Sequence, residues 1–139
     1  MIFLLSCLSE SPSHKVVHKF PVIAIQANGK TYPVEYAQYP HEVALGLRFR
    51  KLTPNEGILL NATGLASKGS ISMKNMRSPI STAMIDSDDI IQDIWSFSVD
   101  SNEKKLPPYV KFIWEMPKGW FKRERIQKYT HINGIPKSP

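Results

Sequence analysis

The chain has 139 residues, of which 42% are hydrophobic and 22% are charged. This is the make-up of one globular domain that buries enough surface to fold without covalent staples. Its single cysteine, Cys7, excludes an internal disulfide framework and any multi-cysteine metal site. The formal net charge of +6 permits contact with nucleic acid, an anionic membrane or an acidic polymer, but it identifies none of them.

Residues 1–15 read as the remnant of a signal peptide followed by a Ser/Pro tether. The apolar run Met1–Cys7 is far shorter than the roughly 20 residues that a membrane span needs. Leu4-Leu-Ser-Cys7 resembles a bacterial lipobox, in which Cys7 carries a lipid. No Lys or Arg precedes the run and Leu5 is not the favoured residue there, so a disordered apolar terminus is the alternative. The lipobox interpretation predicts an extracytoplasmic protein, either periplasmic or tethered to a membrane.

The domain is predicted to open with a β-hairpin. The extended runs Val16–Gln26 and Lys30–Tyr36 flank Ala27-Asn28-Gly29. Asn-Gly is a strong hairpin signal because both positions accept a positive φ.

A short amphipathic helix is predicted next, within Pro40–Arg50. A proline suits the first helical position. Apolar residues recur at helical spacing: Val43, Ala44 and Leu47. Gly46 destabilises a helix relative to alanine, so its presence predicts close packing against a strand. Basic residues crowd the expected end of the helix, where they suit its dipole: Arg48, Arg50 and Lys51.

The stretch Ser70–Asp86 is predicted to hold two strand-like runs on either side of Arg77-Ser-Pro79, since proline cannot donate to a strand ladder. Lys74 and Asn75 interrupt the first run. If they are buried, such side chains must be paired, and if they are exposed, they are available to a ligand.

Further strands are predicted at Gly57–Leu60, Ile90–Phe97 and Tyr109–Met116, the last with Lys111 and Glu115 on its non-buried side. One or two helical turns over Trp120–Gln127 and an extended piece at Tyr129–Ile132 follow. These elements predict a mostly β (α+β) fold: a small antiparallel β-barrel-like or sandwich-like domain over residues 16–132 with one or two short helices. Residues 133–139 are expected to form a flexible tail.

Four segments in order also carry a family resemblance. They are Tyr39–Arg50, Asn55–Leu60, Met73–Asp86 with its Met-Lys-Asn and Pro-Ile motifs, and Lys111–Gly119. Together they resemble domain-of-unknown-function family 192, an uncharacterised protein family, over roughly residues 20–130. Ser72 and Ser81 depart from the pattern, since the family usually has an aromatic and an acidic residue there. The family has no established activity, so the resemblance implies the fold more than the function.

Sequence motifs of common enzymes are absent. There is no Gly-x-Ser-x-Gly elbow, P-loop, dinucleotide fingerprint or His-Glu-x-x-His motif, and no cofactor is expected. His14 and His18 have metal-like spacing but stand where no helix is expected. Asp86, Asp88 and Asp89 superficially resemble a calcium loop, yet the glycine and the bidentate glutamate that complete one are missing. A solvated turn is expected there and no metal site is predicted.

A basic run near the C-terminus has two interpretations. Its members are Lys118, Lys122, Arg123, Arg125 and Lys128, with Trp120 and Phe121 between them. They are suited to phosphates, or they form a solvated helix face whose aromatic residues belong to the core. The second is favoured because the aromatic residues are adjacent, so no specific nucleic acid partner is expected. If Cys7 is lipidated, the same cations suit an anionic membrane surface.

The remaining candidates are the polar positions within the family-like motifs: Arg50, Lys74, Asn75 and Glu115. If the strands bring them together, they suit a small anionic, zwitterionic or polar ligand, and the leading hypothesis is a non-enzymatic binding domain. One alternative is a hydrolase-type enzyme that uses Glu115 as acid or base with Lys74 and Arg50 stabilising charge. Another is a structural or partner-binding component in which Glu115 pairs with Arg50 or Lys74. A cleft that raises the pKa of Glu115 favours the enzyme, and a paired Glu115 on an open sheet face favours the structural role.

Overall fold

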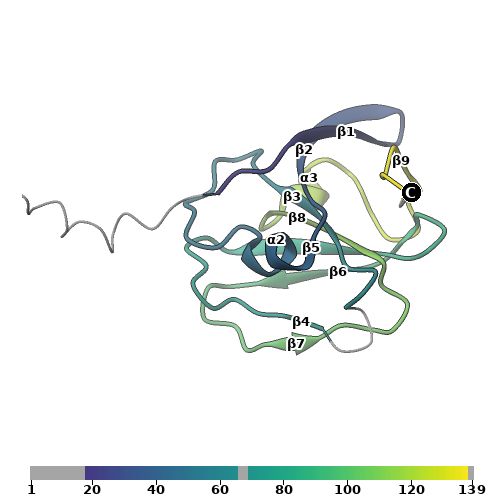
Figure 1. Ribbon diagram of the computed structural model, residues 1–139. Coiled ribbons are helices and arrows are strands. Elements are labelled where there is room, and N and C mark those ends of the chain that lie inside the picture. Colours follow the sequence, from purple (N-terminus) through teal and green to yellow (C-terminus); the bar gives the residue numbers. More distant parts are fainter. Residues whose placement is uncertain (1–17, 66–68, 138–139) are drawn as a thin grey trace, which may run out of the picture.

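A single curled sheet organises the protein, as the computed structural model in Figure 1 shows for the described residues 18–65 and 69–137. The elements are β1 (Val22–Ala27), β2 (Lys30–Ala37), α2 (Pro40–Leu45), β3 (Ile58–Asn61), β4 (Ser70–Ile71), β5 (Ile80–Ile85), β6 (Ile91–Phe97), β7 (Lys104–Lys105), β8 (Phe112–Pro117), α3 (Trp120–Arg123) and β9 (Ile132–Asn133). Seven strands form a half-barrel sheet in the order β6-β5-β8-β3-β2-β1-β9, while β4 and β7 form a separate pair. The predicted mostly β fold with two short helices is confirmed.

The opening hairpin forms as predicted. Ala27 pairs with Lys30, and the turn residues Asn28 and Gly29 have φ values of 54° and 79°. The left-handed conformation at both positions matches the twist of the flanking strands. The hairpin therefore fixes the register of β1 against β2.

The helix α2 starts where it was predicted and ends earlier. The proline is its first residue, and Glu42 accepts hydrogen bonds from the backbone of the N-cap Tyr39 and its neighbour. Gly46 follows its last turn with φ 48° and ψ −127°, a conformation that only glycine adopts readily. The prediction that Arg48 and Arg50 lie at the helix end is therefore wrong, because the chain has already left the helix.

One pair of strands departs from the antiparallel prediction. β2 and β3 run parallel, with Glu35 opposite Ile58, and α2 forms part of the crossover between them. The other neighbouring pairs of the sheet are antiparallel.

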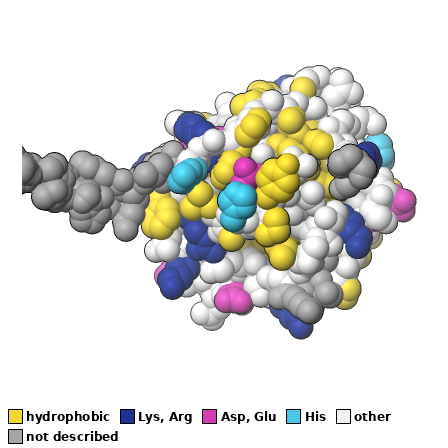
Figure 2. All heavy atoms as spheres, viewed as in Figure 1, with side chains coloured by type: hydrophobic (Ala, Val, Ile, Leu, Met, Phe, Trp, Pro, Cys, Tyr) yellow, Lys and Arg dark blue, Asp and Glu magenta, His cyan; other side chains and the backbone are white. Residues whose placement is uncertain are grey.

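Two apolar clusters contain alternate residues of the same strands. One holds Leu59, Ala83 and Trp114 with the aromatic rings of Trp120 and Phe121. The other contains Leu47, Leu60, Ile71, Ile80, Met84 and Ile113. Because strand side chains alternate, these clusters lie on opposite faces of the sheet. Figure 2 shows hydrophobic side chains gathered on the side of the molecule that carries α2.

Three further predictions need correction. Lys74 and Asn75 lie in a turn and not in a strand, and Asn75 has φ 64°. β8 begins at Phe112, and the face that carries Glu115 is buried, because both faces of this strand are covered. The C-terminal residues 133–137 are not a loose tail, since Ile135 is buried in the aromatic cluster and Lys137 pairs with Asp89 at 2.6 Å.

Candidate functional site

Glu115 is a buried carboxyl group in the middle of the sheet. It lies between Ile58 of β3 and Thr82 of β5 in the strand register, and only 6% of it is exposed. Among the described residues no group forms a hydrogen bond or an ion pair with it. A buried polar group without a partner is uncommon in folded proteins and calls for a functional explanation.

A pocket of about 260 Å³ lies over Glu115. Its wall comes from α2 and the segment after it, from β3, β5 and β8, and from β4 and the loops around β4 and β7. The lining side chains are mostly apolar: Val43, Leu45, Leu47, Leu60, Leu65, Ile71, Met76, Ile80, Leu106 and Ile113. Small polar groups are supplied by Ser70 and Ser72, and the ionisable groups in the lining, among the residues that the structure describes, are Arg48 and Glu115. An apolar pocket with a few polar groups is the usual form of a small-molecule site.

Burial raises the pKa of Glu115 to about 7, and the nearby positive charge of Arg48 opposes this only in part. The low-dielectric surroundings disfavour the ionised form, and no hydrogen-bond donor compensates for the loss of water. Glu115 therefore gains and loses its proton near neutral pH.

Arg48 borders the same pocket but does not pair with Glu115. Its Nε donates to the carbonyl oxygen of Ala44 at 2.9 Å, and one terminal nitrogen donates to the carbonyl oxygen of Lys74. Its partners are thus backbone carbonyl groups, which fix the side chain but do not neutralise its charge.

Gly46 keeps the approach to Glu115 open. A Cβ at this position would lie 4.0 Å from Oε1 of Glu115, so a longer side chain there would extend towards the carboxyl group. Its positive φ disfavours any other residue as well. The glycine thus ends α2 and leaves space above the buried carboxyl.

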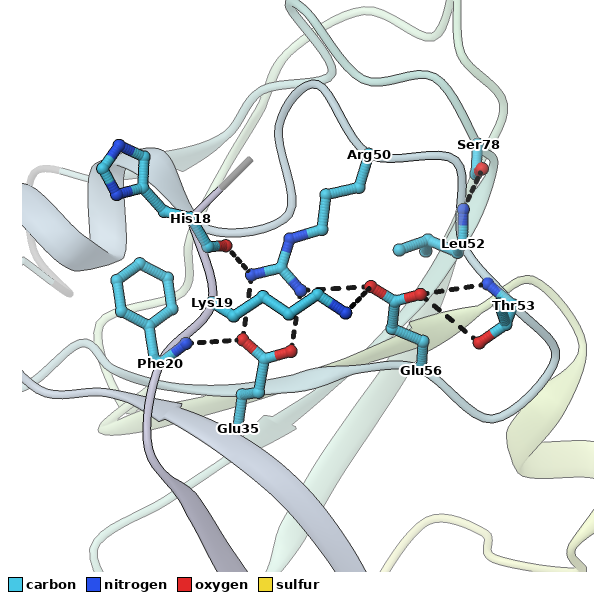
Figure 3. A network of polar contacts seen from close by, with 9 residues as sticks. All are labelled: His18, Lys19, Phe20, Glu35, Arg50, Leu52, Thr53, Glu56 and Ser78. Atoms are coloured by element: carbon cyan, nitrogen blue, oxygen red, sulfur yellow. Dashed lines mark hydrogen bonds and ion pairs between the residues drawn. The ribbon is translucent and has the colours of Figure 1, made fainter. Parts of the chain in front are cut away.

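Arg50 belongs to a different and closed network, shown in Figure 3. It is 2% exposed and binds both carboxylate oxygens of Glu35, at 2.7 and 2.9 Å. It also donates to Glu56 at 3.1 Å and to the carbonyl oxygen of His18, and the backbone N–H of Phe20 donates to Glu35 at 2.8 Å. Burial lowers the pKa of Arg50, but Glu35 and Glu56 outweigh this and raise it above its ordinary value. The alternative prediction that Arg50 pairs with Glu115 is wrong.

Lys74 and Asn75 lie at the surface, in a turn beside the pocket. Both side chains are exposed, and neither residue lines the pocket. Their carbonyl oxygens accept hydrogen bonds from Arg48 and from the backbone N–H of Phe49, the latter at 2.8 Å. The motif therefore anchors the loop through its backbone. Ligand binding by these side chains stays a prediction.

The structure thus separates the four predicted site residues. Glu115 is in the pocket, Arg50 is in the closed network, and Lys74 and Asn75 are in the turn. The pocket residues Arg48 and Gly46 were noticed in the sequence only as parts of the helix. Their position two to four residues before Arg50 does not indicate a pocket. Gly46 and Arg48 border the pocket with Glu115 because α2 ends at Leu45, earlier than predicted.

The two departures from the family pattern have different surroundings. Ser72 lines the pocket, and its hydroxyl accepts a hydrogen bond from the backbone N–H of Lys74 at 3.2 Å. Ser81 is buried away from the pocket, where its hydroxyl contacts Ser96 and accepts from Gly119 N–H. Of the two, only the serine at position 72 can alter the shape of the pocket.

The basic run has its aromatic residues in the core. Trp120 and Phe121 are each 2% exposed, whereas the cationic side chains of the run are exposed. Three of these, Lys122, Arg125 and Lys128, border a shallow hollow of about 540 Å³.

The remaining candidates from the sequence concern metal binding, membrane insertion and the N-terminal segment. Within residues 18–65 and 69–137 no three His, Cys, Asp or Glu side chains form a metal-binding group, and Asp86 accepts hydrogen bonds from the backbone of its own turn. No described helix is long and apolar enough to cross a membrane. Cys7 and His14 lie outside the described residues.

Fold and pocket together define a small half-barrel β domain with one buried, unpartnered carboxyl group. The model of the family DUF192 (Uncharacterized ACR, COG1430) matches residues 23–134. The chain belongs to this family.

Two solved structures share the fold. One is a protein of unknown function from Novosphingobium aromaticivorans, with a TM-score of 0.71 and 19% identity over 85% of this chain and 91% of that one. The other, a proposed transcription regulator from Sinorhizobium meliloti, has a TM-score of 0.69 and 24% identity over 84% of this chain and 96% of that one. No curated protein matches the chain.

Proposed function

We propose that this domain binds a small, partly apolar ligand in the pocket beside α2. The observation that carries the proposal is Glu115, a buried carboxyl group without a partner in an otherwise apolar wall. Burying such a group costs free energy unless a hydrogen-bond partner is supplied. A ligand with a donor group supplies that partner, and the apolar side chains cover the rest of the molecule.

The size of the pocket limits the ligand. A volume of about 260 Å³ lies just below the roughly 300–1,000 Å³ that is usual for small-molecule pockets, so we expect a small ligand. This corresponds to one polar head with a short aliphatic body.

An enzymatic role is the second candidate, because a carboxyl group with a pKa of about 7 suits general acid–base catalysis near neutral pH. However, Lys74 and Arg50, which were expected to stabilise charge in such an enzyme, do not line the pocket. Within residues 18–65 and 69–137, the lining supplies serine hydroxyls but no histidine, cysteine or lysine side chain. Binding without chemistry is therefore the better supported function.

We further propose that the domain works outside the cytoplasm, tethered through a lipid on Cys7. The lipobox-like Leu4-Leu-Ser-Cys7 supports this. When the full-length gene is expressed with a basic start upstream, the protein should appear in the membrane fraction with Cys7 acylated. A Cys7→Ala variant should lose the acyl group and leave that fraction. A soluble wild-type product with an unmodified Cys7 thiol would contradict the proposal.

Binding in the pocket can be tested by NMR of isoleucine methyl groups. The probes are four small molecules with one branched aliphatic chain: 3-methylbutan-1-ol, 3-methylbutylamine, 4-methylpentanoate and L-leucine. At least one should shift the methyl resonances of the pocket residues Ile71, Ile80 and Ile113 in a saturable manner. The residues Ile25, Ile91 and Ile132 in the other cluster provide the internal control and should not shift.

A variant of a lining residue tests whether the probes bind inside the pocket. Ser72→Phe places a large side chain at the pocket lining and should weaken binding of every probe while the control methyl groups keep their wild-type shifts. If none of the four probes moves the pocket methyl groups at millimolar concentration, the proposed function is wrong.

A further inference from the structure

We infer that the ligand is a small zwitterion of the amino-acid type, whose ammonium group pairs with Glu115 and whose carboxylate pairs with Arg48. This inference rests on the proposed function. Its starting point is that two side chains of opposite charge border one pocket without forming an ion pair with each other. A dipolar molecule between them satisfies both.

Arg48 is held ready for an anion. Two of its nitrogens donate to the carbonyl oxygens of Ala44 and Lys74, which orient the guanidinium group. Its Nη2 makes no hydrogen bond with a described residue. Because the partners are uncharged, the positive charge is not neutralised, and a guanidinium group is well suited to a carboxylate.

Glu115 provides the negative charge that pairs with the ammonium group of the ligand. Among the described residues, α2, β3, β4, β5 and β8 with their loops place Arg48 and Glu115 in the pocket lining and no other ionisable side chain. The glycine at position 46 leaves room above the carboxyl group, so an ammonium group can approach it.

Charge balance selects a zwitterion over a singly charged molecule. A carboxylate alone would satisfy Arg48 and leave Glu115 buried without a partner, while an amine alone would satisfy Glu115 and add a second cation near Arg48. The zwitterion adds no net charge to the site. The aliphatic side chains of Leu60, Ile80 and Ile113 suit an aliphatic chain on the ligand.

Isosteric probes test the inference directly. Calorimetric titration at pH 8 should show that L-leucine binds at least tenfold more tightly than 4-methylpentanoate, which lacks the ammonium group, and than 3-methylbutylamine, which lacks the carboxylate. Equal affinity of either singly charged probe and L-leucine would overturn the inference. So would tight binding of the neutral 3-methylbutan-1-ol alone, although the proposed function would then stand. If none of the four probes binds, the proposed function itself is contradicted.

Two variants test which side chain pairs with the ammonium group and which pairs with the carboxylate of the ligand. Glu115→Gln should lower the affinity for L-leucine to the level of 4-methylpentanoate and leave 4-methylpentanoate binding intact, which also shows that the variant is folded. Arg48→Gln should lower L-leucine to the level of 3-methylbutylamine. Lys74→Ala, a nearby exposed cation outside the pocket, should leave all affinities unchanged. Unchanged L-leucine affinity in Glu115→Gln would contradict the assignment.

The affinity should also follow the ionisation of Glu115. Since an ammonium group needs the carboxylate form, binding of L-leucine by the wild type should weaken by about tenfold between pH 8 and pH 6. The Glu115→Gln variant should show no such change. A flat profile in the wild type would count against the pairing of the ammonium group with Glu115.

Discussion

Two buried carboxyl groups of this domain have opposite surroundings. Glu35 is 8% exposed, receives two hydrogen bonds from Arg50 and one from the backbone of Phe20, and is closed off by them. Glu115 is 6% exposed and has no such partner, and the nearest arginine of the pocket, Arg48, is bound to backbone carbonyl groups instead.

A structural carboxylate and a candidate binding carboxylate can be told apart by their hydrogen-bond partners. The Glu35 network joins residues 18–20 to the loop after α2, and both carboxylate oxygens of Glu35 accept hydrogen bonds, although Nε of Arg50 is buried without a partner among the described residues (Figure 3). The carboxylate of Glu115 keeps its capacity to accept hydrogen bonds from a ligand, and its burial lowers the free energy of unfolding when it is ionised. The hydrogen bonds that each carboxylate accepts, three for Glu35 and none from a described residue for Glu115, distinguish the two sites, whereas burial and charge do not.

The largest effect is expected from breaking the closed network. Arg50→Ala leaves Glu35 buried and without its bidentate partner, which should lower the free energy of unfolding by about 3–5 kcal/mol. Urea unfolding at pH 7 measures the loss. As a control, Glu56→Gln keeps the Arg50–Glu35 pair and should cost clearly less. Equal losses in the two variants would show that the pair with Glu35 is not the dominant contact.

The next effect concerns Glu115 and pH. Its folded-state pKa of about 7 lies above the ordinary value of 4.5. Below about pH 4.5 the group is protonated in both states and imposes no penalty. Between 4.5 and 7 the unfolded state ionises first, so the free energy of unfolding falls as pH rises, by about 3 kcal/mol once pH exceeds 7.

Glu115→Gln removes this penalty. The variant should therefore match the wild type at pH 4.5 to within about 1 kcal/mol and exceed its stability at pH 8 by about 3 kcal/mol. Taking the difference between the two proteins at each pH cancels the contributions of the other titrating groups. A variant that is less stable than the wild type at pH 8 would mean that Glu115 has a stabilising partner after all.

The smallest effect is expected at Lys74. Its side chain is exposed and makes no ion pair with a described residue, while its backbone oxygen, which Arg48 binds, is kept in any variant. Lys74→Ala should change the free energy of unfolding by no more than about 0.5 kcal/mol, measured by urea unfolding. A larger loss would show that the Lys74 side chain has a structural contact, as the alternative in which it pairs with Glu115 expected.

The local elements and the family could be predicted from the amino-acid sequence. Asn28-Gly29 specifies the hairpin, Pro40 the start of the helix, and the strand-like run Ile80–Ile85 after Pro79 a strand, because each depends on neighbouring residues and backbone conformation only. The ordered motifs also led to the correct family over residues 23–134. Glu115 was a candidate from the start for the same reason, since it lies within one of these motifs.

Tertiary structure alone decided which charges meet. Arg48 and Arg50 are two residues apart, yet one borders the pocket and the other pairs with Glu35, because α2 ends at Leu45 and the chain then turns between two parallel strands. The burial of Glu115 likewise depends on tertiary structure, because the two apolar clusters cover both faces of β8. In a strand that is covered on both faces, the alternation of polar and apolar residues no longer shows which side is buried. Pairing between distant strands is a property of the whole sheet, and no local pattern encodes it.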